Sequence, residues 1–480
     1  MVTHTVEKIG GTSMSQYPAV RDNIFLRSKE KKDIYNRIFV VSAYGGVTDR
    51  LLEHKNSDKP GVYALFTSSE KEYAWQEALD EVCDHVLSIN KELITNPLIR
   101  EQADSFITER IEGVRSCLMD LQRVCSYGHF QLTEHLYTIR EMLSSLGEAH
   151  SAFNTAILLS DEGVNARFID MTGWREQANM PMDVKINKTL EQFRLDAELP
   201  IVTGYTQCSE GLMKTFNRGY TEMTFSRFAV LSKAEEAIIH KEYHLSSADP
   251  GIVGEEASVP IGRTNYDVAD QLANLGMEAI HPMAARGLRE NNIPLRVKNT
   301  FEPEHGGTLI TGDYISETPR VEIIAGHSHV SAIEVFDQNM VNTNHHDKAI
   351  LEILEKCKVK IMSKDLNANT ITHFVDTNLK TINKIVEELE KRFPDADINT
   401  TRVAIVSAIG SDMQVPGILA KTVKSLSDAN ISVLALHQSM RQVDMQFIVS
   451  EDDYESAVRR LHKELIEPLN HEYAIAAVSS

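Results

Sequence analysis

The chain has 480 residues, of which 42% are hydrophobic and 25% are charged, a balance typical of a folded protein with two or three domains. Its 49 basic and 69 acidic residues give a net charge of −20, which argues against a nucleic-acid or anionic-membrane partner. Five scattered cysteines without a CxxC pair, a polar N-terminal stretch and the lack of a long apolar run predict a cytoplasmic protein with reduced thiols.

The first 310 or so residues alternate between expected strands and expected helices, as in a mainly parallel α/β sheet. Pro18 opens the first expected helix, and strict helical spacing over 107–121 and 136–146 predicts longer helices within and after a helical insertion at about 55–140. The expected strands cover 6–9, 37–42, 166–171, 200–205, 236–240 and 294–297.

The last third repeats the order β-α-β-β-α at a constant offset of 72 residues. The offset relates residues that hold the same place in each copy, namely Leu354 and Leu426, Val375 and Phe447, and Val386 and Val458. A duplication of a small α/β unit at fixed spacing predicts two ferredoxin-like modules.

The first candidate site lies at the end of the first expected strand. Lys8 is followed by Gly10, Gly11 and Ser13 before a helix, so a cation and backbone N–H groups face one region. A phosphate group is the expected ligand, although a Gly-Gly turn of this kind is often only structural. The loop is not a Walker A motif, because the lysine precedes the glycines.

Six short motifs, in order, resemble those of the aspartokinases in the amino-acid-kinase superfamily. They include Lys-Ile-Gly-Gly-Thr-Ser at the start and lie at 8–13, 41–48, 145–151, 218–224, 276–282 and 306–310. The terminal modules resemble the pair of ACT domains of these enzymes. The resemblance implies an α/β amino-acid-kinase fold, with a central mainly parallel sheet between helices, over 1–312, then ACT domains at 318–398 and 399–475.

The implied reaction transfers the γ-phosphoryl group of ATP, with Mg²⁺, to the β-carboxylate of L-aspartate. A carboxylate is already ionised at neutral pH, since its pKa is about 4, and therefore needs no general base. It needs alignment with ATP and relief of the negative charge on the transferred group.

The resemblance also implies roles for individual residues. Lys8 relieves the phosphoryl charge, Arg218 grips a substrate carboxylate with two hydrogen bonds, and Glu148 receives the α-ammonium group. The simpler interpretations are an edge charge for Lys8, a solvated helix charge for Glu148 and an ion pair with Glu222 for Arg218. The expected set is Lys8 and Glu222 for catalysis, Gly10, Gly11, Ser13, Lys241, Ser246 and Asp249 for ATP, and Ser42, Thr48, Glu148, Arg218 and Thr221 for aspartate.

No protein ligand for a metal is expected, since His327, His329, His345 and His346 lack acidic or cysteine neighbours at ligand spacing.

Several positions depart from the family pattern. Glu222 stands where relatives have Asp, and its longer side chain can still orient Lys8. Lys241 stands where relatives have Asp and Glu278 where they have Lys, which suggests an exchange of charges between neighbouring positions. With the altered nucleotide loop at 240–250 and the segment 263–271, these departures resemble the divergent branch associated with ectoine biosynthesis.

Two other functions remain open from the sequence: a kinase for another amino acid such as glutamate, and a non-catalytic amino-acid sensor. The ACT pair implies a homodimer or homotetramer. The segment 436–441 replaces the polar stretch where relatives keep effector contacts, so feedback inhibition is expected to be altered or weak.

Overall fold

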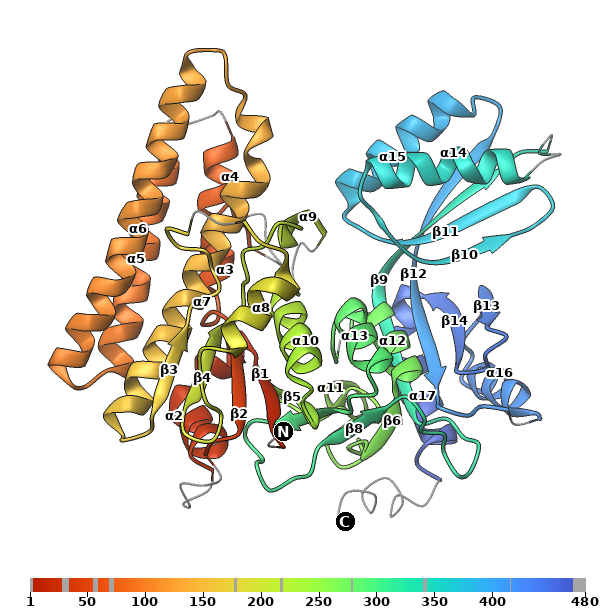
Figure 1. Ribbon diagram of the computed structural model, residues 1–480. Helices are drawn as coiled ribbons and strands as arrows, with labels where there is room; N and C mark the ends of the chain where they lie inside the picture. Colours follow the sequence, from red (N-terminus) through yellow and green to blue (C-terminus); the bar gives the residue numbers. More distant parts are fainter. Residues whose placement is uncertain are drawn as a thin grey trace. The chain divides into compact units, whose positions relative to one another are not determined.

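The computed structural model describes residues 3–27, 34–54, 59–68, 73–176, 179–215, 219–277, 279–338, 340, 343–414 and 416–468. Two predicted residues, Arg218 and Glu278, lie outside this described part. The chain forms two compact units, one made of Met1–His244 and Ile280–Gly312, the other of Leu245–Ala279 and Asp313–Ser480 (Figure 1). The predicted domain boundaries stay a prediction; the compact units differ from them in assigning Leu245–Ala279 to the second unit.

The first unit is built on a sheet whose strands run in the order β3-β4-β2-β1-β5-β7-β8. All neighbours are parallel except β7 and β8, and β1 lies in the interior, between β2 and β5. The strands are β1 (Thr5–Ile9), β2 (Arg37–Val41), β3 (Ala166–Ile169), β4 (Leu199–Thr203), β5 (Glu236–Lys241), β7 (Leu295–Asn299) and β8 (Thr308–Thr311). The six strands expected from the sequence are confirmed; β2 (RIFVV) and β4 (LPIVT) show the mostly apolar runs typical of strands buried on both faces.

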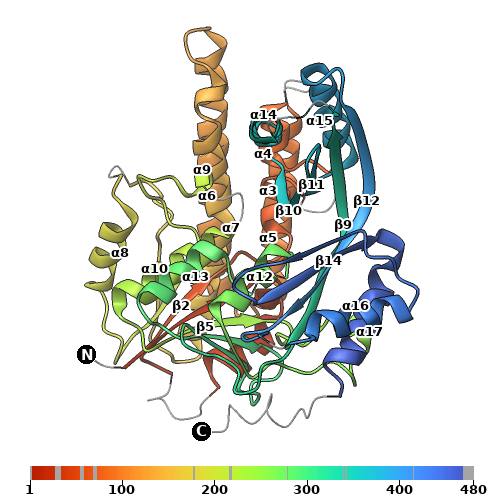
Figure 2. The ribbon, with the colours of Figure 1, turned by 90° about the vertical axis from the view of Figure 1, so that its right-hand side faces the viewer.

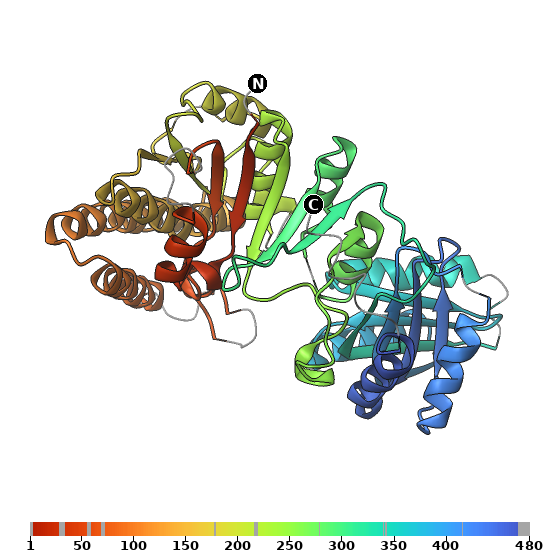
Figure 3. The same ribbon diagram turned by 90° about the horizontal axis from the view of Figure 1, so that it is seen from below.

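Helices cover both faces of this sheet (Figure 3). The helices of this unit are α1 (Gly11–Met14), α2 (Tyr17–Val20), α3 (Val47–Leu51), α4 (Val62–Thr67), α5 (Ala74–Leu93), α6 (Pro97–Ser126), α7 (Leu136–Asp161), α8 (Met182–Leu190), α9 (Leu212–Thr215), α10 (Tyr220–Ser232) and α13 (Pro282–Glu290). Helix α7 contacts β2, β3 and β4, while α10 contacts β1, β2 and β5. The long helices α5 and α6 pack together through buried residues at helical spacing, such as Val82 and Val86 on α5 and Ile107 and Ile111 on α6.

The second unit contains an antiparallel sheet in the order β10-β11-β9-β12-β14-β13. Its strands are β9 (Ile323–Phe336), β10 (Lys360–Leu366), β11 (Thr370–Asp376), β12 (Asp397–Ile409), β13 (Ala435–Gln438) and β14 (Asp444–Ser450), and β6 (Arg263–Asn265) also belongs to this unit. Its helices are α11 (Pro250–Val253), α12 (Tyr266–Asn274), α14 (Thr343–Lys356), α15 (Leu379–Arg392), α16 (Ile418–Asp428) and α17 (Tyr454–Leu465).

The expected duplication is confirmed, since β9-α14-β10-β11-α15 and β12-α16-β13-β14-α17 have the same order. The long strands β9 and β12 run side by side and join the two modules (Figure 2). Strand β12 pairs with β9 along its length, from Ile323 opposite Ile409 to Phe336 opposite Asp397, and the last part of β9, from Ser331, also pairs with β11. One strand therefore serves both modules. In the described part of the chain, no helix is long and apolar enough to span a membrane.

Candidate active site

The expected phosphate loop follows β1, in the interior of the first unit's sheet. Successive side chains of a strand alternate between faces, so Ile9 joins the core beneath α7 while Lys8 points to the face that carries α10. Gly10 has an extended backbone at the start of α1. A Cβ atom on Gly11 would lie 2.6 Å from the carbonyl oxygen of Ala43, so only glycine lets the two loops approach each other.

Lys8 is held by Glu222, which lies 214 positions further along the chain. The Lys8 Nζ lies 3.1 Å from Glu222 Oε1, and both residues are 9% exposed. The other carboxylate oxygen accepts a short hydrogen bond from the backbone N–H of His281. Burial alone raises the pKa of Glu222, but the charges of Lys8 and Lys241 and these hydrogen bonds lower it below its usual value. Glu222 is therefore ionised and fixes the Lys8 ammonium group.

Glu148 lies beside this pair and is the most unusual titratable group of the site. It is 2% exposed, and its Oε1 accepts a 2.6 Å hydrogen bond from Thr221 Oγ1, on the first turn of α10. Its Oε2 has no hydrogen-bond partner among the described residues. Burial raises the pKa of Glu148 to about 8, although the Thr221 bond, the backbone N–H of Tyr205 and the charge of Lys8 oppose the shift. The residue is therefore not a solvated helix charge.

The segment 42–48, called here the 42–48 loop, carries the predicted substrate residues Ser42 and Thr48. The backbone N–H of Ser42 donates to Ile9 O at 3.1 Å, and Ser151 Oγ of α7 donates to Ser42 O at 2.7 Å. A Cβ atom on Gly147 would lie 2.8 Å from the Cβ of Ala43, so this glycine lets α7 pack closely on the loop. The loop is thus fixed between β1 and the helix of Glu148.

Two residues with side-chain oxygens near the phosphate loop, Glu242 and Thr300, were not predicted from the sequence. The Ser13 hydroxyl donates to Glu242 Oε1 at 3.1 Å and lies 3.1 Å from the hydroxyl of Thr300. Glu242 directly follows β5 and Thr300 directly follows β7. The rule that ligands bind at the carboxyl ends of parallel strands could have identified both positions.

The remaining predicted residues fall into two groups. Lys241 ends β5 and contributes to the lowered pKa of Glu222. Ser246 and Asp249 belong to the second unit, where Ser246 forms an isolated bridge with Pro260 and Asp249 caps α11. Because Arg218 and Glu278 lie outside the described residues, the grip of Arg218 and the proposed charge exchange between Lys241 and Glu278 stay predictions.

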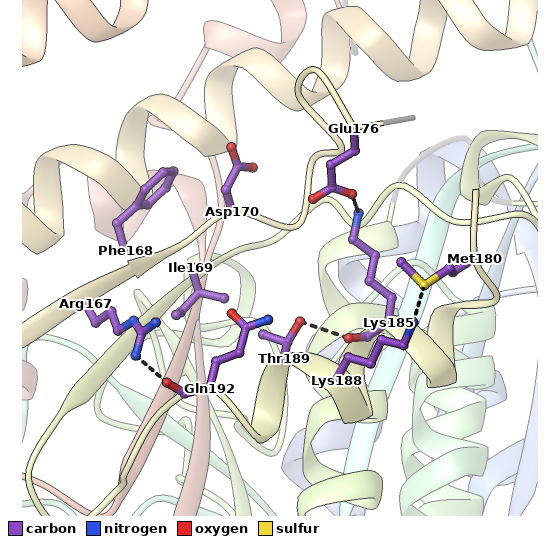
Figure 4. A pocket seen from close by; sticks show the side chains of 10 residues that line it. All are labelled: Arg167, Phe168, Ile169, Asp170, Glu176, Met180, Lys185, Lys188, Thr189 and Gln192. Atoms are coloured by element: carbon purple, nitrogen blue, oxygen red, sulfur yellow. Dashed lines mark hydrogen bonds and ion pairs between the residues drawn. The ribbon is translucent and has the colours of Figure 1, made fainter. Parts of the chain in front are cut away.

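A pocket of about 340 Å³ opens elsewhere in the first unit, beside β3 and α8 (Figure 4). None of the predicted site residues lines it. Its buried cation, Lys185, pairs with Glu176 at 2.8 Å, and Arg167 pairs with Glu198 at 3.2 Å. We therefore do not assign the active site to this pocket. Over the described ranges, no group of three or more His, Cys, Asp or Glu residues is arranged to hold a metal ion.

Comparison with known proteins relates the chain to a family. Residues 4–299 match the amino acid kinase family, and residues 406–465 match the ACT domain. The chain is 54% identical over 474 residues to "Aspartate kinase Ask_Ect" of Stutzerimonas stutzeri (strain A1501), which covers 99% of this chain and 100% of that protein. It is 25% identical over 488 residues to "Aspartokinase 1, chloroplastic" of Arabidopsis thaliana, covering 96% and 80% of the two chains.

Solved structures agree on the fold. The crystal structure of E. coli aspartokinase III in complex with aspartate and ADP has a TM-score of 0.71 at 19% identity and covers 97% of this chain and 100% of its own. Clostridium acetobutylicum aspartate kinase gives a TM-score of 0.70 at 21% identity over 96% and 100% of the two chains. The chain therefore belongs to the amino acid kinase family, on its aspartate kinase branch, and ends in an ACT region.

Proposed function

We propose that this protein transfers the γ-phosphoryl group of ATP to the β-carboxylate of L-aspartate, which gives ADP and 4-phospho-L-aspartate. The observation that carries the proposal is the buried Glu148 carboxyl, with one oxygen held by Thr221 and the other without a described protein partner. A buried acceptor of this kind fits the α-ammonium group of an amino acid. Lys8 and Glu222 lie close to Glu148, so the Lys8 ammonium group can offset the negative charge of the transferred phosphoryl group.

The chemistry of the site suits an acceptor that is already ionised. Because the β-carboxylate of aspartate needs no base, the protein's task is to align two anions and to offset the charge of the moving phosphoryl group. The Lys8 ammonium group supplies that charge, and Glu222 holds it in place from the other side. Gly10, Gly11 and Ser13 offer backbone and hydroxyl donors to the phosphates, with Lys241, Ser246 and Asp249 assigned to ATP by resemblance.

Aspartate is bound by the rest of the predicted set. Glu148 takes the ammonium group, while Ser42, Thr48 and Thr221 are assigned neutral hydrogen bonds and Arg218 the bidentate grip of a carboxylate. Mg²⁺ favours oxygen ligands and uses few protein carboxylates alongside phosphates, so the carboxylate of Glu242 and the hydroxyl of Ser13 fit the donors that it takes. When bound, Mg²⁺ lowers the negative charge of the phosphates.

Three features beyond the reaction belong to the same proposal. The protein is assigned to the cytoplasm and to the first step of the aspartate pathway, feeding ectoine synthesis, because its sequence resembles that branch. The ACT modules are assigned the subunit contacts of a homodimer or homotetramer. Strand β13 lies at an edge of its sheet; Leu436 on the strand is 41% exposed, and Leu434 and Met440 on either side of it are 56% and 97% exposed. Exposed apolar side chains beside a sheet edge are a common basis for pairing between subunits.

The proposal is tested by trapping the product. The purified protein is incubated with ATP, Mg²⁺ and hydroxylamine, together with L-aspartate or L-glutamate, and the hydroxamate is measured. We expect hydroxamate with aspartate and far less with glutamate. Product from glutamate alone would instead indicate a glutamate kinase, and no product with any amino acid would indicate a non-catalytic sensor.

A further inference from the structure

A group of buried polar side chains lies beside the 42–48 loop and outside the predicted site. Asn90 on α5 and His150 and Asn154 on α7 are each 0% exposed, and Asp104 on α6 is half-buried. These four residues, called here the Asn90 cluster, join the three long helices of the first unit. The proposed chemistry uses none of them.

A chain of hydrogen bonds runs through the cluster, from Asp104 on α6 through Asn90 on α5 to His150 and Asn154 on α7. Asn90 Nδ2 donates to Asp104 Oδ1 at 2.8 Å, which leaves Asn90 Oδ1 facing α7. That oxygen lies 2.6 Å from His150 Nε2 and accepts from Asn154 Nδ2 at 2.7 Å. Because a carboxylate without a proton only accepts hydrogen bonds, Asp104 fixes which end of the Asn90 amide points to His150.

This orientation fixes the state of the His150 ring. Its Nε2 lies 2.6 Å from the acceptor Asn90 Oδ1 and 3.1 Å from the donor Asn154 Nδ2; the shorter contact places the proton on Nε2, so Nδ1 is left as an acceptor. Burial, with a smaller effect from the charge of His85, lowers the pKa of His150 to about 3. The ring is therefore neutral at neutral pH and held as one tautomer in one orientation.

The fixed ring supports the 42–48 loop. The ring of Tyr44 packs edge-on against the imidazole of His150, with 5.3 Å between ring centroids and 70° between the planes. Tyr44 is 2% exposed and lies between Ser42 and Thr48 on the loop. Burial raises the pKa of the Tyr44 hydroxyl, and the side chain of Asn154 beside it acts in the opposite direction.

Stability alone does not account for polar side chains at this place. In the described part of the chain, His150 Nδ1 and Asn154 Oδ1 are buried without a hydrogen-bond partner. Buried polar atoms without partners cost stability, whereas apolar groups of the same shape do not. The cluster is better explained by a requirement for one loop conformation.

We propose that the Asn90 cluster is a positioning device for the substrate loop. It holds the His150 ring so that Tyr44 keeps the 42–48 loop in the conformation that presents Ser42 and Thr48 to the substrate. The helices α5 and α6 thereby contribute to substrate binding without touching the substrate. The kinetic part of this inference rests on the proposed aspartate kinase function, whereas the position of the loop does not.

Two substitutions at His150 separate positioning from simple packing. His150→Leu removes the donor to Asn90, while His150→Gln keeps an N–H group near the place of Nε2. We expect His150→Leu to raise the KM for aspartate by about tenfold or more, since small displacements of binding groups have effects of this size. The KM for ATP should change little, and His150→Gln should restore the KM for aspartate most of the way.

Arg110→Met is the matched control. Arg110 is a buried polar residue of α6 that bonds to Thr172 and Asp170, away from the 42–48 loop. The Arg110→Met substitution should lower the melting temperature without changing the KM for aspartate.

Hydrogen–deuterium exchange of the peptide that covers the 42–48 loop is measured on the same proteins without substrate. Exchange should be faster in His150→Leu than in the wild type, His150→Gln or Arg110→Met. If exchange in this loop is the same in all four proteins, the inference is wrong, whatever the activity. If the loop exchanges as expected but no protein forms phospho-aspartate, the proposed function fails and the positioning role of the cluster stands. An unchanged KM for aspartate in an active His150→Leu enzyme also overturns the inference.

Discussion

Thr221 Oγ1 and Glu148 Oε1 form a 2.6 Å hydrogen bond between two helices, α10 and α7, that are distant in sequence. The bond joins the helix that carries Glu222 to the helix that packs on the 42–48 loop. It also leaves the second oxygen of Glu148 available, within the described structure, for a cationic group of a ligand. The account of substrate binding therefore depends on the ionisation of Glu148.

The first prediction concerns the pH dependence of aspartate binding. Burial raises the pKa of Glu148 to about 8, so this carboxyl is mostly protonated at neutral pH in the ligand-free enzyme. Because the ammonium group of aspartate favours the ionised form, kcat/KM for aspartate should rise between about pH 7 and about pH 9. The measurement is a pH profile of kcat/KM, and Glu148→Gln should be flat and about a hundredfold lower. A wild-type profile without this rise contradicts the assignment.

The second prediction concerns the effect of Glu148 on how the stability of the substrate-free protein changes with pH. Its pKa is raised from 4.5 to about 8, so the folded chain holds a proton that the unfolded chain has already released across that range. The contribution of Glu148 to the free energy of unfolding therefore falls as the pH rises from about 4.5 to about 8. Glu148→Gln removes this loss, so its melting temperature relative to the wild type should increase with pH. A difference that is constant with pH would show that Glu148 is not a buried neutral acid.

Thr221 gives the third prediction. Thr221→Val removes the hydroxyl donor that favours ionised Glu148, so the pKa of Glu148 should rise further and the midpoint of the kcat/KM profile should move up by about one pH unit. Thr221→Ser keeps a hydroxyl and serves as the control. Equal midpoints in the valine and serine variants would mean that this hydrogen bond does not tune the site.

Much of the fold follows from local pattern, as two features illustrate. The strand of Lys8 is predicted from the segment 6–9 that leads into the Gly10-Gly11 turn, and it appears at Thr5–Ile9. The repeat that relates Val375 to Phe447 indicates equivalent strands, and these residues lie on β11 and β14. Such patterns depend on short segments or on a fixed spacing, so they can be recognised in a single sequence.

Fewer contacts of the candidate site could be predicted from the sequence. The pairing of Lys8 with Glu222 was expected through the family pattern, but the contact of Ser13 with Glu242 was not. That contact depends on which strand lies beside β1, a question of topology that local spacing does not answer. His150 was missed for another reason: a histidine on a helix gives no sign of burial until its neighbours on other helices are known.

A fourth prediction concerns a buried ion pair on the face of β1 opposite to Lys8. Arg37 donates two hydrogen bonds to Glu7, at 2.7 and 3.0 Å, and His240 contacts the same carboxylate at 2.7 Å. Arg37→Met leaves a buried carboxylate without its main partner and should lower the free energy of unfolding by about 3–5 kcal/mol. The measurement is urea denaturation at neutral pH.

The ionisation of Glu7 also affects the stability of the protein in acid. Burial tends to raise the pKa of Glu7, but Arg37 and His240 outweigh it and hold that pKa far below 4.5. The stabilisation is therefore present above about pH 4.5 and is lost as the pH falls toward the folded-state pKa. The loss of stability in acid should be shallower in Arg37→Met, and an unchanged acid limb would contradict this role for the pair.

The fifth prediction concerns regulation. The segment 436–441 is expected from the sequence to lack the polar effector contacts of relatives, and part of it forms the edge strand β13. We expect neither lysine nor threonine alone to halve the rate at saturating ATP and aspartate. The measurement is a titration of each amino acid in the steady-state assay, and strong inhibition by either one would show that the ACT region keeps an effector site for it.

We propose that Lys8, held by Glu222, serves phosphoryl transfer to aspartate. The most direct test is the rate of ADP formation from ATP with L-aspartate, measured for the wild type and for Lys8→Met, with circular dichroism to confirm that both are folded. The account predicts an aspartate-dependent rate in the wild type and a fall in kcat of about a thousandfold in the variant, with a smaller change in the KM for aspartate. A folded Lys8→Met enzyme that keeps a rate close to that of the wild type would contradict it.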